Sequence, residues 1–491
     1  MGVIDIGSNS LRLVVYDGLT RAPIPLFNEK VMCGLGRTVE KTGRLDPDGV
    51  VLALNNLDRF CTILCGMQVG RVDVVATAAV RDAADGTAFV EEVGRRTGLR
   101  VRVVPGSEEA RLSAMGVLSG MPAADGLMGD LGGGSLEMVG MDAGSVGPET
   151  PVTLPLGPLR LIEASGGKCD RAAKMVDQQL DAVDWLPAYQ GRTLYPVGGS
   201  WRALAKLHME QVKHPLHIIH HYAADTVQLR DFLALLSRQS RSSLEKMSGI
   251  SRRRADTLPF AALVMERLLR RLEPAQVVFS AYGLREGLLF DLLNAQERRA
   301  DPLLEACAAV AHRLGRFGTA DVLAGWTASL FPGEDAAEAR LRTAACLLSD
   351  LGWAEHPDYR AEHAFLRVLR MPFSGADHSE RAWLALACYV RYAGRADDAP
   401  TAAARLLLDE AQAGRATVLG QALRLAQTLT GGVAGLLQRT SLGLGDDAVT
   451  LMLPEDSRVL VGDVVQRRLD ALAKTVKRTG TIAYRPKPRA A

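Results

Sequence analysis

Two glycine-rich turns, about one domain apart in the chain, constrain its fold more than any other feature. The first lies in Val3-Ile4-Asp5-Ile6-Gly7-Ser8-Asn9-Ser10, and the second in Gly129-Asp130-Leu131-Gly132-Gly133-Gly134-Ser135-Leu136-Glu137. Each predicts a strand ending in aspartate, a tight turn of small residues and a second strand. Backbone N–H groups exposed in such a turn bind phosphate oxygens, and the aspartate can hold a divalent cation. Two such turns facing each other would clamp a phosphoryl group.

Simpler interpretations of these turns are possible. One aspartate followed by glycine and serine is ordinary turn chemistry, but two copies at the same place in a strand–turn–strand unit make that interpretation insufficient. Neither turn is a Walker loop, because no Gly-Lys-Ser/Thr follows. Gly132-Gly133-Gly134 is followed by a strand-like stretch and not by the helix that a dinucleotide fingerprint requires. The pair therefore indicates a phosphate site of another kind.

The duplicated turn resembles the phosphate 1 and phosphate 2 motifs of the actin, sugar kinase and chaperone ATPase superfamily. Within it, roughly residues 1–295 are similar to the exopolyphosphatase and guanosine pentaphosphate phosphatase family. The segments that carry this resemblance are Asp5–Ser10, Ala76–Arg81, Gly106–Leu112, Asp130–Glu137 and Gly283–Leu289. The resemblance implies an α/β fold of two ribonuclease H-like lobes of the actin-like ATPase type, followed by a mainly helical domain.

The order of strand and helix signals agrees with this architecture. We expect an N-terminal lobe over residues 1–122, a second lobe over 123–298 and a mainly helical domain with a basic tail over 299–491. In the first two regions we expect strands near 2–6, 10–17, 72–76, 100–104, 193–197 and 276–279, and helices near 47–66, 87–97 and 107–118. Ser107 is the expected N-cap of the last helix, with Glu108 and Glu109 in its first turn.

The C-terminal region is rich in alanine and leucine with helical periodicity, and strands are expected near its end at Val449–Leu453 and Val459–Val461. The resemblance implies an HD-phosphohydrolase-like domain here. Its metal-binding His-Asp pair is missing, because Ser349 stands before Asp350 where the histidine would be. We therefore expect a domain without HD catalysis that serves dimer contact and extends a polyanion channel.

Acidic residues provide the candidate base and metal ligands. The resemblance implies that Glu109 is the general base, although acids in the first turn of a helix are also favoured by the helix dipole alone. It further implies that Asp130 and Glu137, with Asp5 approaching from the first lobe, hold Mg²⁺. This ion suits hard oxygen ligands and substrate phosphates.

The phosphate itself would be held by an arginine and by the turns. Arg81 matches the family's active-site arginine, and its planar guanidinium can bind two phosphate oxygens. The loop Gly198–Arg202 departs from the family pattern Gly-x-Ser-Gly-Thr by placing Trp201 and Arg202 there, and Trp201 is expected to serve packing. The predicted phosphate-binding residues are Ser8, Asn9, Gly132, Gly133, Gly134, Ser135, Gly199 and Ser200.

Composition and charge narrow the class of protein. The formal net charge is +2, so no global field requires nucleic acid as a partner. The arginines at 252–254, 267, 270 and 271 and the basic tail from Ala471 are either solvated faces or tracks for a polyanion. Seven scattered cysteines without Cys-x-x-Cys indicate reduced thiols. No apolar stretch approaches the ~20 residues that span a bilayer. We expect a cytoplasmic protein with no membrane partner.

The resemblance, together with the basic clusters and the long helical domain, favours an exopolyphosphatase that hydrolyses the terminal phosphoanhydride of inorganic polyphosphate with Mg²⁺. A guanosine pentaphosphate 5′-phosphohydrolase, which makes the tetraphosphate alarmone, would use the same pocket. A kinase of the wider superfamily is a further alternative, but no clear nucleotide-base pocket is evident near Ser280–Gly287. A non-catalytic polyphosphate or alarmone sensor is the alternative of another class. The resemblance also implies a homodimer.

Overall fold

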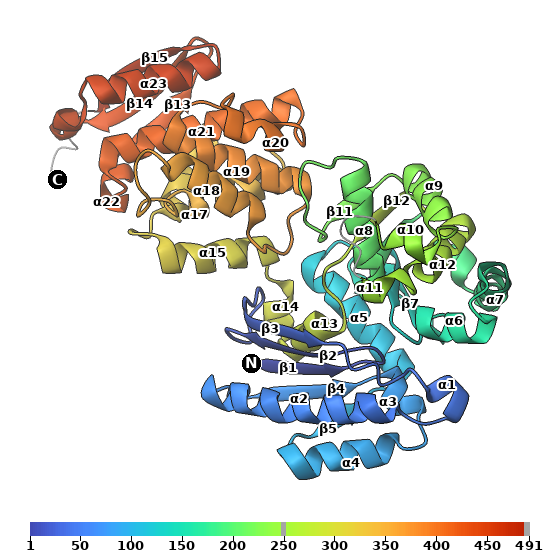
Figure 1. Cartoon of the computed structure of the whole chain (residues 1–491). Coiled ribbons are helices and arrows are strands. Elements are labelled where there is room, and N and C mark those ends of the chain that lie inside the picture. Colours follow the sequence, from blue (N-terminus) through green and yellow to red (C-terminus); the bar gives the residue numbers. More distant parts are fainter. Residues whose placement is uncertain (247–251, 486–491) are drawn as a thin grey trace. The chain divides into compact units, whose positions relative to one another are not determined.

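The computed structural model describes residues 1–246 and 252–485, and Figure 1 labels its elements. The chain divides into two compact units, Met1–Ala300 and Asp301–Ala491. The first unit contains two sheets with helices, and the second is mainly helical with one small sheet. The predicted fold class is confirmed at this level. The boundaries at residues 122 and 298 and the likeness to an HD domain stay predictions.

The first sheet forms the core of one lobe of the first unit. Its five strands lie in the order β3-β2-β1-β4-β5. Strand β1 (Gly2–Ile6) pairs antiparallel with β2 (Leu11–Tyr16) and parallel with β4 (Val72–Ala76), and the outer strands are β3 (Pro25–Val31) and β5 (Val101–Val103). Strands β1 and β2 are buried on both faces, as their nearly continuous apolar runs predict. The helices of this lobe are α1 (Val39–Thr42), α2 (Pro47–Gly66), α3 (Ala78–Asp82) and α4 (Gly86–Thr97).

The second sheet repeats the same arrangement in the other lobe. Strand β6 (Gly126–Leu131) pairs antiparallel with β7 (Leu136–Asp142) and parallel with β10 (Thr193–Val197), as β1 does with β2 and β4. The order is β11-β12-β10-β6-β7-β8, and β9 pairs with β7. The remaining elements are β8 (Ser145–Val146), β9 (Val152–Leu154), β11 (Tyr222–Ala224), β12 (Gln276–Phe279), α6 (Pro158–Ser165), α7 (Cys169–Asp181), a 3₁₀ turn (Leu186–Tyr189), α8 (Gly199–Gln211), α9 (Thr226–Leu236), α10 (Arg241–Leu244), α11 (Arg252–Ala255), α12 (Leu258–Leu272) and α14 (Ala295–Arg299).

Helices α5 (Gly106–Gly120) and α13 (Leu284–Leu292) cover the face of the first sheet opposite to α2 and α4. Their backbones touch. A Cβ atom at Gly287 would lie 1.7 Å from the carbonyl oxygen of Leu112, and one at Gly116 would lie 2.1 Å from that of Gly283. Glycine is therefore required at both positions, because any side chain would push the helices apart. This contact fixes α5, whose first turn carries Glu108 and Glu109.

Replacing Gly287 with alanine tests that contact. We expect Gly287→Ala to destabilise the first unit by about 1–3 kcal/mol, because overpacking forces the two backbones apart. In the control Gly94→Ala, the nearest atom to the new Cβ lies 3.7 Å away in an ordinary van der Waals contact. That variant should gain about 0.5–1 kcal/mol from its higher helix propensity. Urea unfolding measures both changes, and equal effects would contradict the packing described.

The second unit builds its core on long helices. Helix α19 (His378–Ala393) is buried along most of its length and lies against α18 (Arg360–Arg370) and α21 (Glu410–Thr430). At the position predicted to correspond to an HD pair, Asp350 Oδ1 pairs with Arg316 Nη2 at 2.6 Å and Ser349 donates a hydrogen bond to the Cys346 carbonyl at 2.8 Å. These contacts are structural. The other elements are α15 (Pro302–Leu314), α16 (Ala320–Thr327), α17 (Ala336–Leu348), α20 (Ala402–Arg405), α22 (Ala434–Leu437), β13 (Ser441–Leu444), β14 (Ala448–Pro454), α23 (Asp463–Thr475), β15 (Thr479–Arg485) and 3₁₀ turns at Ala328–Leu330, Ala399–Thr401 and Glu455–Leu460.

Two local predictions are wrong. Ser107 is not the N-cap of α5, because the helix begins one residue earlier and Pro105 accepts its first hydrogen bond, from the Glu109 N–H at 2.9 Å. The expected strand at Val459–Val461 is mostly a 3₁₀ turn, Glu455–Leu460. Strand β14 pairs in parallel with β15, and the chain between these two strands contains the crossover helix α23. The apolar residues at 459–461 belong to this connection. The prediction of free thiols is confirmed for all seven cysteines.

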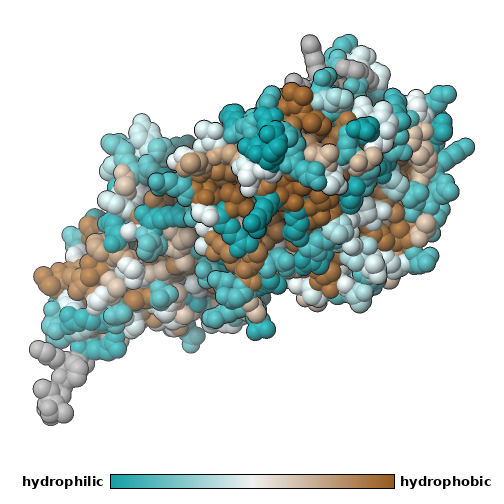
Figure 2. Space-filling model, turned by 90° about the horizontal axis from the view of Figure 1, so that it is seen from below, coloured by the Kyte–Doolittle hydropathy of each residue, from teal (hydrophilic) through white to brown (hydrophobic). Residues whose placement is uncertain are grey.

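The surface carries scattered apolar side chains. On α2, Val51 and Leu52 are 59% and 41% exposed. On the face seen in Figure 2, hydrophobic residues gather near the middle among hydrophilic ones. Among the described residues, no helix is both long enough and apolar enough to cross a bilayer.

Candidate active site

A cavity of about 180 Å³ lies between the two hairpin turns of the first unit. Both turns are closed by the same backbone hydrogen bond. The Gly7 N–H donates to the Ser10 carbonyl at 3.0 Å, and the Gly132 N–H donates to the Ser135 carbonyl at 2.9 Å. The structure therefore brings together the two motifs that the sequence indicates. The predicted residues that line the cavity are Asp5, Ser8, Asn9, Glu109, Asp130, Gly132, Gly133, Ser135, Glu137, Gly199 and Ser200.

The two hairpins carry opposite charges at matching positions. Asp5 lies opposite Arg12 across β1 and β2, whereas Asp130 lies opposite Glu137 across β6 and β7. Asp5 is neutralised further, because Arg285 Nη1 of α13 donates to its Oδ2 at 2.8 Å. The second hairpin thus has the unpaired negative charge, and the first does not.

Glu137 and Asp130 form a buried acidic pair. Glu137 is only 1% exposed, and its Oε1 accepts no hydrogen bond from the described residues. Burial, with the negative charges of Glu109 and Asp130, raises the pKa of Glu137 well above its ordinary value. Burial also raises the pKa of Asp130, although the Ser113 hydroxyl donates to its Oδ2 at 2.6 Å. An unpartnered buried carboxylate oxygen beside a second carboxylate fits a hard divalent cation.

No three His, Cys, Asp or Glu side chains within the described ranges converge closely enough to hold a metal ion by themselves. Mg²⁺ usually takes one or two protein carboxylates together with substrate phosphates and water, so Asp130 and Glu137 are the two residues that could hold it. Asp5, with its contact to Arg285, is placed on the far hairpin of the cavity.

Glu109 projects from the first turn of α5 with 12% of its side chain exposed. Arg81 Nη1, from α3, donates to its Oε2 at 3.0 Å. Burial raises the pKa of Glu109 to about 7, Arg81 opposes that rise, and Asp130 and Asp5 add to it. A carboxylate with a pKa near neutrality suits general base chemistry, since it can both accept and release a proton.

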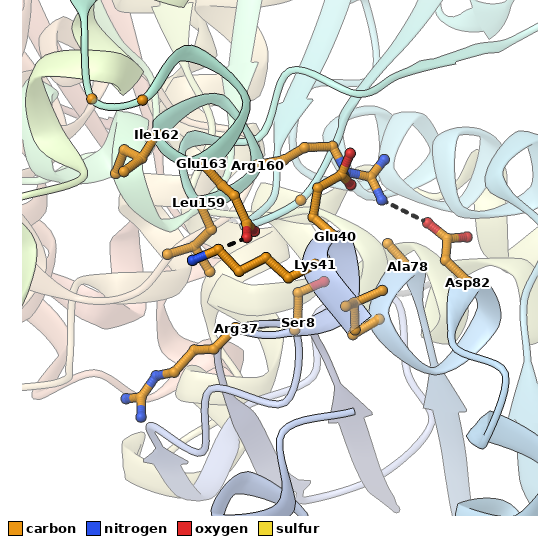
Figure 3. A pocket seen from close by; sticks show the side chains of 16 residues that line it. Ser8, Arg37, Glu40, Lys41, Ala78, Asp82, Leu159, Arg160, Ile162 and Glu163 are labelled. Atoms are coloured by element: carbon orange, nitrogen blue, oxygen red, sulfur yellow. Dashed lines mark hydrogen bonds and ion pairs between the residues drawn. The ribbon is translucent and has the colours of Figure 1, made fainter. Parts of the chain in front are cut away.

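Arg81 and Gly134 are the two predicted residues that do not line this cavity. Besides Glu109, Arg81 donates to the Val104 carbonyl at 3.1 Å and pairs with Asp82 at 3.3 Å. The observed contacts of Arg81 are therefore with the candidate base, not with the open cavity. Gly134 lines a neighbouring cavity in the same unit, drawn in Figure 3.

The sequence missed a group of cations on the cavity wall. Burial, with Arg254 and Arg202 nearby, lowers the pKa of Lys30 to about 8. Burial, with Arg285 nearby, lowers the pKa of Arg202 to about 10. Both shifts arise first from burial and then from the neighbouring cations, and an anionic ligand would oppose both. The lining cations are Arg12, Lys30, Arg202, Arg254 and Arg285. The sequence had noted Arg254 in a basic cluster, Arg285 in the motif Gly283–Leu289 and Arg202 in an irregular loop, but it placed none of them with Arg12 and Lys30 on one wall. Trp201 of that loop is buried and donates to the Ala261 carbonyl at 3.0 Å.

Three arginines of the basic clusters noted in the sequence are neutralised by ion pairs. Arg267, Arg270 and Arg271 pair with acidic side chains of α7 and α12. The side chains of Arg252 and Arg253 and the tail residues Lys487 and Arg489 lie outside the described residues. The α12 arginines are thus a paired surface, whereas Arg254 reaches the cavity wall.

The buried acidic pair predicts an unusual pH dependence of stability. A carboxyl group whose folded-state pKa is raised stabilises the folded state less as pH rises above its unfolded value. Metal-free wild-type protein should therefore lose stability between pH 5.5 and pH 8. Glu137→Gln should lose less and melt roughly 2–4 °C higher than wild type at pH 8. Thermal unfolding in a chelator measures this.

Glu108→Gln is the matched control, since Glu108 pairs with Arg111 at 2.9 Å and its pKa is lowered. This control should show no gain in melting temperature at pH 8. If Glu137→Gln followed wild type at both pH values, Glu137 would not carry the proposed charge repulsion.

Comparisons with known proteins agree with this geometry. A family model described as the Ppx/GppA phosphatase family matches residues 14–296, and one described as exopolyphosphatase, C-terminal, matches residues 309–482. Exopolyphosphatase 1 of Mycobacterium tuberculosis (strain ATCC 25618 / H37Rv) is 29% identical over 318 residues, which cover 60% of this chain and 89% of the relative. Retrograde regulation protein 2 of Saccharomyces cerevisiae is 28% identical over 433 residues, which cover 80% of this chain and 72% of that protein.

Solved structures show the same fold for the first unit. An exopolyphosphatase from Cytophaga hutchinsonii superposes with a TM-score of 0.55 at 24% identity, covering 59% of this chain and 96% of that one. The Aquifex aeolicus PPX-GPPA enzyme gives a TM-score of 0.50 at 26% identity, covering 59% of this chain and 97% of that one.

Proposed function

The chain belongs to the Ppx/GppA phosphatase family, and we propose that it is an exopolyphosphatase that releases orthophosphate from the end of inorganic polyphosphate. One observation carries the proposal. A mostly buried glutamate and a buried acidic pair face a cavity between two glycine-rich turns, and cations line its wall. Hydrolysis of a phosphoanhydride needs a base, charge neutralisation and a phosphate cradle, and the cavity has residues for all three.

Glu109 is the proposed general base. Its carboxylate takes a proton from the attacking water as the water oxygen bonds to the terminal phosphorus. The bridging P–O bond breaks, orthophosphate is formed, and the shortened chain leaves with the bridging oxygen. Arg81 holds the Glu109 carboxylate by its 3.0 Å contact, so the base is oriented before substrate arrives. A direct contact of Arg81 with phosphate stays a prediction.

Asp130 and Glu137, with Asp5, are the proposed holders of Mg²⁺. When bound, the ion would neutralise charge on the phosphate oxygens during the displacement. The N–H groups of both turns and of the Gly199–Ser200 loop are proposed to donate to the remaining oxygens, as helix and turn N–H groups do. The cationic side chains of Lys30 and Arg202 would neutralise negative charge on the phosphates of the polymer.

The finer properties are also proposals. We infer a cytoplasmic enzyme that acts without nucleic acid or membrane and forms a homodimer. Guanosine pentaphosphate is the alternative substrate, because it ends in the same kind of bond. A relative named guanosine-5′-triphosphate,3′-diphosphate pyrophosphatase, from Photobacterium profundum, is 23% identical over 307 residues, which cover 59% of this chain and 59% of that protein.

Phosphate release by the purified protein with Mg²⁺ tests this function. Long-chain polyphosphate and guanosine pentaphosphate are compared as substrates for wild type, Glu109→Gln and Glu108→Gln. We expect polyphosphate to be preferred and Glu109→Gln to lower kcat by about 10²–10⁴-fold, the usual contribution of a general base. Glu108→Gln should stay near wild type, because Glu108 does not line the cavity and is held by Arg111.

Preference for the nucleotide, with the same loss in Glu109→Gln, would move the function to alarmone conversion. Equal losses in both variants would remove Glu109 as the specific base. Activity of wild type on neither substrate, with binding retained, would favour the sensor.

A further inference from the structure

The cavity in Figure 3 lies beside the catalytic one, between α1 and α3 of the first lobe and α6 of the second. It has a volume of about 510 Å³ and shares Ser8 and Ala78 with the catalytic cavity. Charged side chains from the two lobes meet across it. The two lobes are therefore joined by ion pairs immediately next to the proposed site of hydrolysis.

Arg160 of α6 makes two of these contacts. Its Nη2 pairs with Asp82 Oδ2 at 3.1 Å, and its Nε pairs with Glu40 Oε2 at 3.0 Å. Figure 3 shows Arg160 reaching across the cavity to Asp82. The side chain of Arg160 is 24% exposed and that of Asp82 is 34% exposed, so both are partly shielded from solvent. Two directional contacts from one guanidinium fix its place better than a single point charge would.

Asp82 continues the series toward the candidate base. Its Oδ1 accepts from Arg81 Nε at 3.3 Å, and Arg81 Nη1 donates to Glu109 Oε2 at 3.0 Å. An unbroken series of charged contacts thus runs from Arg160 of the second lobe through Asp82 and Arg81 to Glu109. We propose that Arg160 and Asp82 are positioning residues that make the orientation of Glu109 depend on the contact between the lobes.

A second ion pair at the same junction lacks this connection. Lys41 of α1 and Glu163 of α6 lie 3.4 Å apart, with Lys41 75% exposed. Within the described part of the chain, neither side chain forms an ion pair with Arg81 or Asp82. This pair bridges the same two helices as Arg160 and Glu40, so it separates a general effect of joining the lobes from a specific effect on Glu109.

Removing the charge of Arg160 and removing that of Asp82 should have opposite effects on the pKa of Glu109, because Asp82 and Glu109 share Arg81. When Arg160 is replaced, Asp82 keeps its ion pair with Arg81. Arg81 is then drawn toward Asp82 and away from Glu109. Without the charge of Asp82, Arg81 is left to Glu109. The other charged groups that face Glu109, namely Asp5 of β1, Asp130 of β6 and Glu137 of β7, are the same in both variants.

The experiment compares the pH dependence of kcat/KM for polyphosphate in wild type, Arg160→Gln, Asp82→Asn and Glu163→Gln, all with saturating Mg²⁺. The acid limb is the pH range in which kcat/KM rises as Glu109 loses its proton. In Arg160→Gln this limb should move to higher pH, and in Asp82→Asn it should move to lower pH. Each shift should be roughly half a pH unit, which is smaller than the 1–3 units that a direct ion pair causes. In Arg160→Gln, kcat should fall on the order of tenfold through misplacement of the base. Glu163→Gln should keep the wild-type limb.

This inference rests on Glu109 acting as the base of the proposed function, and the two can fail separately. If wild type releases no phosphate, the proposed function fails. If wild type is active but the limbs of Arg160→Gln and Asp82→Asn move together or not at all, the positioning role is wrong. A shift in Glu163→Gln equal to that in Arg160→Gln would also overturn it, because lobe contact in general would then be the cause.

Discussion

The repulsion between buried carboxylates in the second hairpin is the constraint on which the site depends. Asp130 and Glu137 lie opposite each other across β6 and β7, and Glu109 raises the pKa of Glu137 further. Like charges held close together away from water are unfavourable unless a cation joins them. The fold tolerates this arrangement because β6 and β7 lie inside the sheet and nearly all of their other residues are buried. The strain is thus located where a metal ion and a phosphoryl group would relieve it.

The two lobes use one backbone pattern for two electrostatic purposes. Each has a hairpin followed by a parallel strand, and each turn is closed by the same hydrogen bond. The residue opposite the aspartate then decides the local charge, since it is Arg12 in the first lobe and Glu137 in the second. With Lys30 and Arg202 on the same wall, the cavity has an acidic side and a basic side. A phosphoanhydride needs both, because its oxygens bind cations while its hydrolysis needs a base.

The sequence predicted much of this fold and many of the residues that line the candidate site, because the signals for them lie within short segments of the chain. The two turns and the central strands are coded by glycines and apolar runs within a few residues. The edge strand Pro25–Val31 was missed because polar residues alternate along it and much of it is exposed. The cation wall was missed for a different reason: Arg12, Lys30 and Arg202 come from β2, β3 and α8 and meet only in the folded chain.

The partners of Arg81 could not be predicted for the same reason, because its contact with Glu109 joins residues that are distant in the sequence. The family resemblance implied a contact of Arg81 with phosphate, whereas its observed side-chain partners are Glu109 and Asp82. Arg160 lies 78 residues after Asp82 in the chain, and no motif of the sequence joins them. The sequence therefore indicates which residues gather at the site, and tertiary packing decides which of them touch.

The number of protons released when Mg²⁺ binds tests the central claim most directly. Titration calorimetry of metal-free protein near pH 6.5, repeated in two buffers of different ionisation enthalpy, gives that number. Because a cation must displace protons from carboxyl groups whose pKa values are raised, we expect about one proton per bound ion in wild type and clearly fewer in Glu137→Gln. Binding without proton release, or with equal release in the two proteins, would contradict a metal site built on the buried acidic pair.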